Sequence, residues 1–457
     1  MERSCSRHFE IKTQKNSIMR IALIFFTIII TSCSFDKKSG IWKDGSSLEN
    51  SKDRKFSEFQ KLYTEKKLFN KKVSPNKNLK LELGPLINNN IWADEFYREN
   101  NNTENFKYTN LNKLIFKSKK LSRGNIKKDL LFDGYNFIAS DDRGNIIIYS
   151  LVEEKISYKF NFYKKKAKKI KKKLNIIAKD GIIYVSDNLG YLYAINLQDK
   201  KVFWAKNYKI PFRSNIKVIA NSIIVTDINN SIYFINKFNG EKIKSIPTEE
   251  SPVKNQFINS IAHNGETMFI LNTYGSIYSI NKRSKINWFL NINPSVDIRS
   301  NNLFNSSPLI IHENKMIIST DKMLYVLDSD NGTQIFKKAI DSVVKPIVSG
   351  KNIFLVTRDN LLVCIDLNTG KIFYSVDLNQ QVANYLENKK RNLSIREIAL
   401  LNNQVTVFLN NSYYLQINKI GNLQNIKKLP TKLNSSPIFV NESIVYVNNQ
   451  NKLSFVN

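Results

Sequence analysis

Short apolar runs separated by Asn, Asp and Gly recur along the chain from about residue 86 to its end. One unit reads GIIYVSDNLGYLYAINLQDKKVFW (181–204), and a later one reads NIFLVTRDNLLVCIDLNTGKIFY (352–374). Each unit predicts two strands joined by an Asp- or Asn-containing turn, followed by a short turn and a third strand that ends in an aromatic residue. A further strand that begins near a proline precedes several units, as in SSPIF (435–439). The repeat period of about 43 residues is the length expected of a four-stranded propeller blade.

The turns between these strands are too short for the crossovers that parallel strands need, so the strands are expected to pair antiparallel. Runs such as YVSD and FLVT are apolar on both strand faces, whereas an ordinary antiparallel sheet wets one face. Sheets stacked face to face around an axis satisfy both facts. We therefore predict an all-β fold for residues 86–457, an eight-bladed antiparallel β-propeller in which the closing aromatic residues wedge between neighbouring blades.

Seven complete repeats are followed by an eighth, 435–457, that stops after three strands. An incomplete last blade would leave an unpaired edge. The segment LNKLIFKSKK (111–120) precedes the first repeat and has strand character. We predict that this N-terminal strand pairs with residues 452–456 and closes the ring.

The N-terminus carries an export signal. The apolar run IALIFFTIII (21–30) follows basic residues and precedes Cys33. As a helix it would rise only about 15 Å, half of a bilayer's hydrocarbon core, so a permanent span is not expected. The segment ITSC (30–33) resembles a bacterial lipobox, which implies cleavage of residues 1–32, lipidation of Cys33 with fatty acids such as palmitate, and retention at the outer membrane because Ser34 follows. Translation could also begin at Met19, and the polar stretch 33–85 is expected to be a flexible tether.

Composition excludes several kinds of site. The 457 residues include only three Cys, three His and 15 Gly, so a disulfide scaffold, a zinc cluster or a glycine-rich nucleotide loop is not expected. Cys5 lies before the predicted cleavage point, and Cys364 lies in the apolar run LLVCID, where it should be a buried small hydrophobe. His263 and His312 are interpreted as surface histidines rather than catalytic bases.

The chain is strongly basic, with 70 Lys and Arg against 39 Asp and Glu and a formal net charge of +31. Asn, Ile and Lys are abundant throughout the chain, which is typical of a coding bias. The excess of basic residues is therefore explained equally well by that bias and by selection for an acidic partner. The run YKKKAKKIKKK (163–173) holds eight lysines. Such a run is either a solvated surface or a region attracted to anionic lipid or to an acidic partner. Export of the chain argues against nucleic acid as a partner.

The repeats resemble those of quinoproteins, best in YLYAIN (191–196) and DLNTGKIFY (366–374). Together with the lipobox and the eight repeats, residues 88–457 resemble the BamB family, lipoproteins of the outer-membrane β-barrel assembly machinery. Two positions depart from the repeat pattern: Lys244 stands where an aromatic residue is expected, and Lys200 stands in a glycine position.

This resemblance implies a non-enzymatic scaffold, lipid-anchored at the periplasmic face of the outer membrane. Its implied partners are the periplasmic domains of the barrel-inserting subunit and unfolded outer-membrane proteins. A loop between the second and third blades contacts the partner in that family, and Phe212 and Arg213 occupy the matching place. An arginine beside an exposed aromatic residue suits an interface anchor, and local packing of the arginine is the alternative. The acidic residues expected in the next inter-blade loop are absent from 250–260 apart from Glu250.

Two alternative functions remain at this stage. One is a periplasmic dehydrogenase that uses a quinone cofactor, and the other is a general periplasmic protein-binding propeller. The dehydrogenase family needs a quinone, a Ca²⁺ site, an aspartate base and, in its familiar pattern, a vicinal cysteine pair. This chain has no Cys-Cys pair, and Asp141, Asp187 and Asp227 are interpreted as turn residues. No cofactor, catalytic residue or metal site is therefore expected.

Overall fold

The computed structural model describes residues 68–126, 130–163, 167, 169–250, 258–293, 304–342 and 344–457. All of the described residues belong to one compact unit, 66–457. The predicted signal peptide, the lipidated Cys33 and most of the tether lie outside the described residues. Among the residues that are described, no helix is long and apolar enough to cross a membrane.

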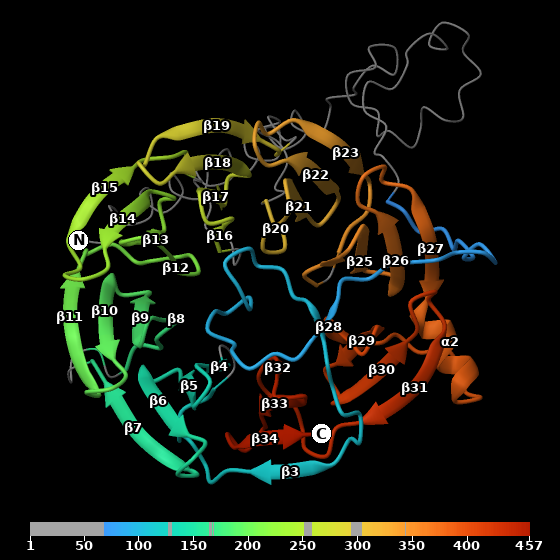
Figure 1. Cartoon of the computed structure of the whole chain (residues 1–457), viewed down its shortest axis with the longest axis horizontal. Helices are drawn as coiled ribbons and strands as arrows, with labels where there is room; N and C mark the ends of the chain where they lie inside the picture. The colour runs from blue at the N-terminus through green and yellow to red at the C-terminus, as the bar shows by residue number, and fades with distance from the viewer. Residues whose placement is uncertain are drawn as a thin grey trace, which may run out of the picture. The chain divides into compact units, whose positions relative to one another are not determined.

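The described strands form eight sheets arranged around a ring, which confirms the predicted all-β propeller (Figure 1). We number these sheets as blades one to eight in chain order. Blade one consists of β4 (Leu130–Phe132), β5 (Asn136–Ser140), β6 (Asn145–Ser150) and β7 (Lys155–Asn161), and blade two of β8 (Leu174–Lys179), β9 (Ile182–Asp187), β10 (Tyr191–Asn196) and β11 (Lys201–Asn207). Blade three consists of β12 (Lys217–Ile219), β13 (Ser222–Thr226), β14 (Ile232–Asn236) and β15 (Lys242–Ile246), and blade four of β16 (Ser260–His263), β17 (Thr267–Leu271), β18 (Ser276–Asn281) and β19 (Ile286–Asn291).

The second half of the ring follows the same plan. Blade five consists of β20 (Ile310–His312), β21 (Lys315–Ser319), β22 (Leu324–Asp328) and β23 (Gln334–Lys338), and blade six of β24 (Ile347–Ser349), β25 (Asn352–Val356), β26 (Leu361–Asp366) and β27 (Ile372–Asp377). Blade seven consists of β28 (Ile395–Leu401), β29 (Gln404–Leu409), β30 (Tyr413–Ile417) and β31 (Leu423–Lys428), and blade eight of β32 (Ile438–Val440), β33 (Ser443–Val447), β34 (Leu453–Val456) and β3 (Leu114–Lys117). Two short strands, β1 (Leu86–Ile87) and β2 (Asn105–Phe106), add in parallel to the inner edge of blade seven. The helix α2 (Leu378–Tyr385) is inserted between blades six and seven.

The eighth blade is completed by the N-terminal strand, as predicted. β3 pairs antiparallel with β34, with Leu114 opposite Val456 and Lys117 opposite Ser454. The first and last parts of the propeller therefore share one sheet, and the ring has no free end at this blade.

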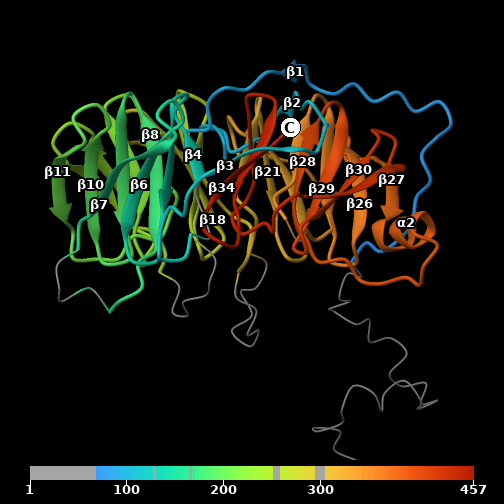
Figure 2. The same ribbon diagram turned by 90° about the horizontal axis from the view of Figure 1, so that it is seen from below.

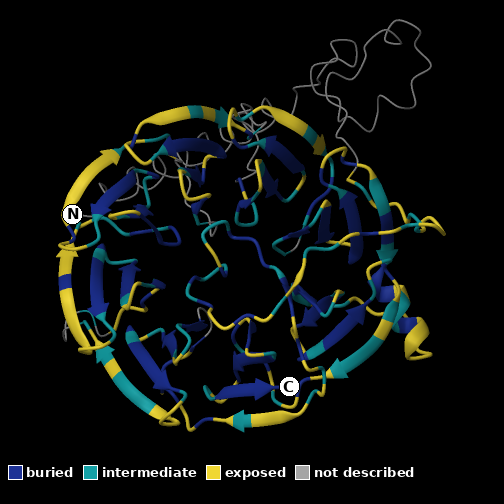
Figure 3. Cartoon of the chain, viewed as in Figure 1, coloured by how far each residue is buried: buried dark blue, intermediate teal, exposed yellow. Residues whose placement is uncertain are grey.

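Burial changes from the axis of the ring to its circumference. In Figure 3 the inner strands are mostly buried and the outermost strands mostly exposed. The third strand of blade six, β26, is buried at five of its six positions, while β15 on the outside of blade three has no buried residue. The three inner strands of a blade are covered on both faces by neighbouring blades, which explains why their sequences are apolar at consecutive positions.

Aromatic residues on outer strands pack against glycines of the next blade, which confirms the predicted wedges. Trp288 of β19 lies against Gly332 in the last turn of blade five, and its indole N–H donates to the Ser329 carbonyl oxygen at 3.0 Å. Gly332 has a φ of +75°, and a Cβ there would lie 2.7 Å from Trp288, so glycine is required for both reasons. Trp204 with Gly240, Phe336 with Gly370 and Tyr374 with Gly421 repeat this contact. We call these contacts rim junctions.

The junction between blades three and four uses a different chemistry. Lys244 replaces the aromatic residue, and its Nζ donates a hydrogen bond to the Ser284 carbonyl oxygen at 2.6 Å. Ser284 occupies the turn position that glycine holds in other blades, with a φ of +58°. Lys244 therefore keeps a contact between blades three and four, as a hydrogen bond instead of an aromatic packing contact.

Candidate functional site

A single segment before the first blade crosses one face of the ring. We call residues 86–106 the strap, and we call the face that it covers the strap face. In Figure 2 its strands β1 and β2 lie above the blades. This face carries the turns between first and second strands and between third and fourth strands, because those turns share one end of an antiparallel sheet. The opposite face, which we call the connection face, carries the remaining turns and the links between blades.

Backbone groups of the strap pair with successive blades. Trp92 exchanges two hydrogen bonds of 2.7 Å with Phe132 of blade one, and the Ala178 N–H of blade two donates to the Ala93 oxygen at 2.9 Å. Further pairs join the strap to blades four, five and eight: His263 N–H to Glu99 oxygen, Ile311 N–H to Asn100 oxygen, and Asn441 N–H to Asn89 oxygen. The strap is therefore an integral part of the ring.

Asparagine side chains complete this network. The Asn101 amide donates to the carbonyl oxygens of Ile261 and Leu309 at 3.0 and 2.9 Å, linking blades four and five. Asn102 donates to the Val348 oxygen of blade six at 2.8 Å, and Asn105 donates to the Asn403 side chain of blade seven at 2.7 Å. With the ion pair to blade three described next, the strap touches all eight blades.

Lys217 and Asp94 form a buried ion pair under the strap. Lys217 begins β12, its side chain is fully buried, and its Nζ lies 2.6 Å from the Asp94 carboxylate. The same ammonium donates to the Arg98 carbonyl oxygen at 2.8 Å. A charge removed from water this far is tolerated only when it is paired and hydrogen-bonded, as Lys217 is.

His263 lies beside this pair at the end of β16 and is 6% exposed, so the expectation of a surface histidine is wrong for this residue. Its Nδ1 accepts a hydrogen bond from the Gly265 N–H at 3.1 Å. Burial, together with the nearby Lys217 cation, lowers the pKa of His263 to about 4. The imidazole is therefore neutral at neutral pH.

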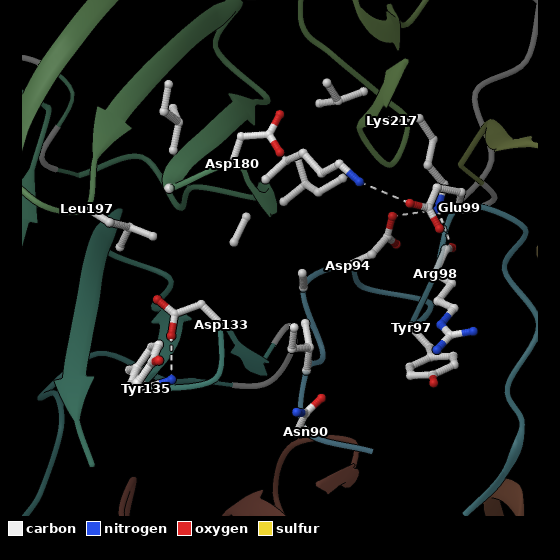
Figure 4. A pocket seen from close by; sticks show the side chains of 18 of the residues that line it. Asn90, Asp94, Tyr97, Arg98, Glu99, Asp133, Tyr135, Asp180, Leu197 and Lys217 are labelled. Atoms are coloured by element: carbon white, nitrogen blue, oxygen red, sulfur yellow. Dashed lines mark hydrogen bonds and ion pairs between the residues drawn. The ribbon is translucent and has the colours of Figure 1, made fainter. Parts of the chain in front are cut away.

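A hollow of about 720 Å³ opens between the strap and blades one to three (Figure 4). Its walls mix apolar groups such as Ile91 and Leu197 with polar and charged ones. The charged groups are engaged by neighbours: the Lys179 ammonium lies 3.1 Å from the Glu99 carboxylate, and the Asp133 carboxylate accepts the Tyr135 N–H at 2.8 Å. Such a wall can bind another molecule, and it presents no nucleophile paired with a base.

The predicted partner-contact loop lies at the connection between blades two and three. Phe212 is 4% exposed, so the expectation of an exposed aromatic residue here is wrong. Its ring packs edge-on against Tyr208 and Tyr233, and its N–H donates to the Asp187 oxygen at 3.0 Å. Phe212 fills the space between blades two and three, because the short connection brings it over the ends of their strands. It supports the loop from within.

Arg213, the neighbouring residue, is only partly buried. Its N–H donates to the Thr226 oxygen at 2.8 Å, and its own carbonyl accepts from Asn259 at 3.0 Å. Partial burial lowers the pKa of its guanidinium from its ordinary value. The loop thus fixes the backbone of Arg213 through hydrogen bonds to blade three and to the residue before blade four.

The lysine run is only partly described, since Lys164, Lys165, Lys166 and Lys168 lie outside the described residues. Of the rest, Lys172 is buried: its ammonium donates to the Ala167 oxygen and lies 5.0 Å from the centre of the Tyr163 ring. Lys169, Lys171 and Lys173 are exposed. The run is therefore not a uniformly solvated stretch, because one of its lysines packs against the protein.

The dehydrogenase alternative would require a site for Ca²⁺. No group of three or more His, Cys, Asp or Glu side chains in the described part of the chain could hold a metal ion. Asp141, Asp187 and Asp227 each accept the N–H groups two and four residues ahead, which confirms their assignment to turns. Cys364 is fully buried in blade six, and burial raises the pKa of its thiol above its ordinary value. That thiol has the environment of an inert core residue.

Comparisons with known proteins agree on the repeat type. Residues 164–376 match the family model described as outer membrane protein assembly factor BamB. No curated protein matches the chain in sequence. Among solved structures, BamB from Moraxella catarrhalis superposes with a TM-score of 0.60 at 12% identity, covering 76% of this chain and 99% of that one.

Other solved structures share the fold. A quinohemoprotein alcohol dehydrogenase from Comamonas testosteroni gives a TM-score of 0.59 at 11% identity over 80% of each chain, and the computationally designed Ika8 protein gives 0.55 at 10%, covering 75% of this chain and 99% of that one. Identities this low show a common fold only. The chain is a propeller of PQQ-like repeats that resembles BamB both in the repeats of residues 164–376 and in its fold.

Proposed function

We propose that this protein is a non-enzymatic scaffold of the outer-membrane β-barrel assembly machinery, anchored to the periplasmic face of the outer membrane through a lipidated Cys33. The observation that carries the proposal is the match of residues 164–376 to the BamB family model, together with a superposition that covers nearly all of a BamB structure. The lipobox-like ITSC sequence supports the anchor.

Binding rather than catalysis agrees with the chemistry of the described residues. On the strap face Lys179 pairs with Glu99 and Lys217 with Asp94, His263 is neutral at neutral pH, and Cys364 is buried in blade six. The dehydrogenase alternative rests on a shared fold, and no group of three or more His, Cys, Asp or Glu side chains in the described part of the chain supports a cation site. A general protein-binding propeller remains the second candidate, and its partner would differ.

The proposed partner is the barrel-inserting subunit, contacted through its periplasmic domains, with unfolded outer-membrane proteins as the cargo that is delivered. Arg213 is the proposed contact residue. Its backbone is held by hydrogen bonds to blade three and to the residue before blade four, and the residue as a whole is partly exposed at this connection. A guanidinium whose backbone is fixed loses less freedom on binding than one on a mobile loop. Phe212 acts indirectly, by packing beneath the loop.

The test is co-purification of the partner from detergent-solubilised envelopes. Arg213→Ala should lower recovery of an outer-membrane barrel with periplasmic repeat domains by about tenfold, as expected for an interface residue worth more than 1 kcal/mol. Arg283→Ala is the matched control, because Arg283 is exposed in a turn of blade four on the strap face. Equal recovery from wild type and Arg213→Ala would remove Arg213 from the interface. Recovery of a dehydrogenase chain or a cytochrome would replace the proposed function.

A further inference from the structure

The first described residues form an arm that lies along the outside of the ring. We call residues 68–83 the arm; in Figure 1 it is the blue segment beside β27 and α2. The Phe69 N–H donates to the Ala339 oxygen at 2.8 Å, and Val73 exchanges two hydrogen bonds of 3.0 and 2.9 Å with Ser375 of β27. The arm therefore covers the outer edge of blade six.

The carboxylate of Asp377 joins the arm to α2. One Asp377 oxygen caps the helix by accepting the Gln380 N–H at 3.0 Å. The other lies 3.0 Å from the Lys72 ammonium of the arm and 2.7 Å from the Lys390 ammonium that follows the helix. The side chain of Asp377 is 7% exposed, so this carboxylate is a fixed junction between the arm, the helix and the loop after it.

The end of α2 presents an amphipathic surface to solvent. Tyr385 and Leu386 are 48% and 52% exposed, although large apolar side chains favour burial. Lys389 and Arg391 follow three and five residues after Leu386, and both are exposed. The arm adds exposed Lys71, Lys72 and Lys77. Exposed Glu387 lies between this Tyr-Leu pair and the cations, so the segment combines apolar side chains with an excess of basic ones. Such a composition is typical of segments that rest in the headgroup region of a bilayer.

We propose that the corner formed by the end of α2 and the arm docks on the surface of an anionic phospholipid bilayer, with Tyr385 and Leu386 entering the headgroup region. This inference rests on the proposed anchoring at Cys33. Thirty-four residues, 34–67, separate Cys33 from the arm, and a linker of that length spans about 30–35 Å on average if it behaves as a random coil. An anchored protein would thus hold this corner near the bilayer at a high effective concentration.

The position of α2 suits simultaneous binding of a partner. α2 lies at the connection between blades six and seven, whereas the Arg213 loop lies at the connection between blades two and three. Four blades of eight separate them, so the two sites lie on opposite sides of the ring, as the labels of α2 and β12 show in Figure 1. A bilayer at one side would leave the other side open.

Spin labels on the mature lipidated protein in vesicles of phosphatidylethanolamine and phosphatidylglycerol test this docking. A label at Leu386→Cys should gain at least twofold in oxygen accessibility and lose access to an aqueous nickel reagent, relative to the same protein in detergent. Val152→Cys is the matched control, because Val152 is 82% exposed on a turn of blade one. A label at 386 that stays as accessible to water as the one at 152 would overturn the docking.

Two further measurements separate the docking from the proposed anchor. Vesicle flotation reports the anchor, which Cys33→Ser should abolish. Lys389→Gln with Arg391→Gln should leave flotation intact and return the label at 386 to water, as should vesicles whose phosphatidylglycerol is replaced by phosphatidylcholine. Flotation with a water-exposed label overturns docking alone, whereas failure of the wild type to float overturns the anchor and the docking with it. Co-purification of the partner reports the scaffold function independently.

Discussion

The centre and the circumference of this propeller are held together in different ways. At the centre, one strap reaches all eight blades through single-copy contacts, including the Lys217–Asp94 ion pair. At the circumference, each rim junction joins only two blades, and the same aromatic-on-glycine contact recurs. A contact that is repeated can vary at one site without loss of the fold, and Lys244 with Ser284 is such a variation. A contact present once has no substitute, so we expect the strap to be the less tolerant region.

The largest effect should come from breaking the ion pair under the strap. Lys217→Met keeps most of the side-chain volume but leaves the buried Asp94 carboxylate without its cation. Loss of one partner of a buried pair typically costs about 3–5 kcal/mol of unfolding free energy. Urea denaturation of the full chain, followed by tryptophan fluorescence, measures this difference.

Lys179→Met provides the matched control, since Lys179 pairs with Glu99 at 3.1 Å in a position where both side chains are more than 40% exposed. Exposed pairs contribute about 0–1 kcal/mol. If the two variants lose similar amounts of unfolding free energy, burial does not make the Lys217 pair more important for stability than the exposed pair.

A somewhat smaller effect is expected from pH, through His263. The pKa of its imidazole is lowered from 6.5 to about 4 by burial and by Lys217. Below pH 6.5 the His263 imidazole becomes protonated in the unfolded chain but stays neutral in the folded protein. The stability that is present above pH 6.5 is therefore lost as the pH falls toward 4. The loss attributable to this group is about 3 kcal/mol. His263→Gln cannot titrate and should lack this part of the acid destabilisation.

The quantity to compare is the change in unfolding free energy between pH 7 and pH 4 in the two proteins. The difference between the two changes reports His263 together with its electrostatic coupling to Glu99, because His263 also lowers the pKa of Glu99. Parallel pH profiles for wild type and His263→Gln would contradict the lowered pKa.

The smallest effect should come from the rim. Trp288→Ala removes a partly buried indole from Gly332 and a hydrogen bond to Ser329, which should lower the unfolding free energy by about 2–3 kcal/mol. Lys244→Ala at the equivalent junction loses one hydrogen bond and should cost about 1 kcal/mol. Thermal unfolding of both variants measures the contrast, and an equal fall in Tm would mean that the lysine junction holds its blades as firmly as the aromatic one.

The rim can be predicted from the sequence because its contact repeats. Trp204 and Trp288 recur at the same place in units of similar length, so period and aromatic position together indicate contacts between neighbouring blades. The closing strand is predictable for a related reason, since an incomplete eighth repeat requires a partner and 111–120 has strand character.

The strap cannot be predicted in this way. Its asparagines satisfy carbonyl oxygens of blades that lie far apart in sequence, and no period marks such contacts. The segment 88–106 is unusually rich in Asn and contains Trp92, which is the one signal that draws attention to it. Lys217 is one of many lysines, and only the fold shows that it is buried. The expectation for Phe212 is wrong because a residue in a loop need not be exposed.

Closure of the ring by β3 and β34 has a consequence for how the protein is made. The Leu453 N–H donates to the Ser118 hydroxyl oxygen across 335 positions of sequence. During synthesis the N-terminal strand emerges first and stays unpaired until the last strand follows it. Contacts between such distant residues slow folding. The blades can therefore form one after another, but the ring becomes a single cooperative body only when the final residues arrive.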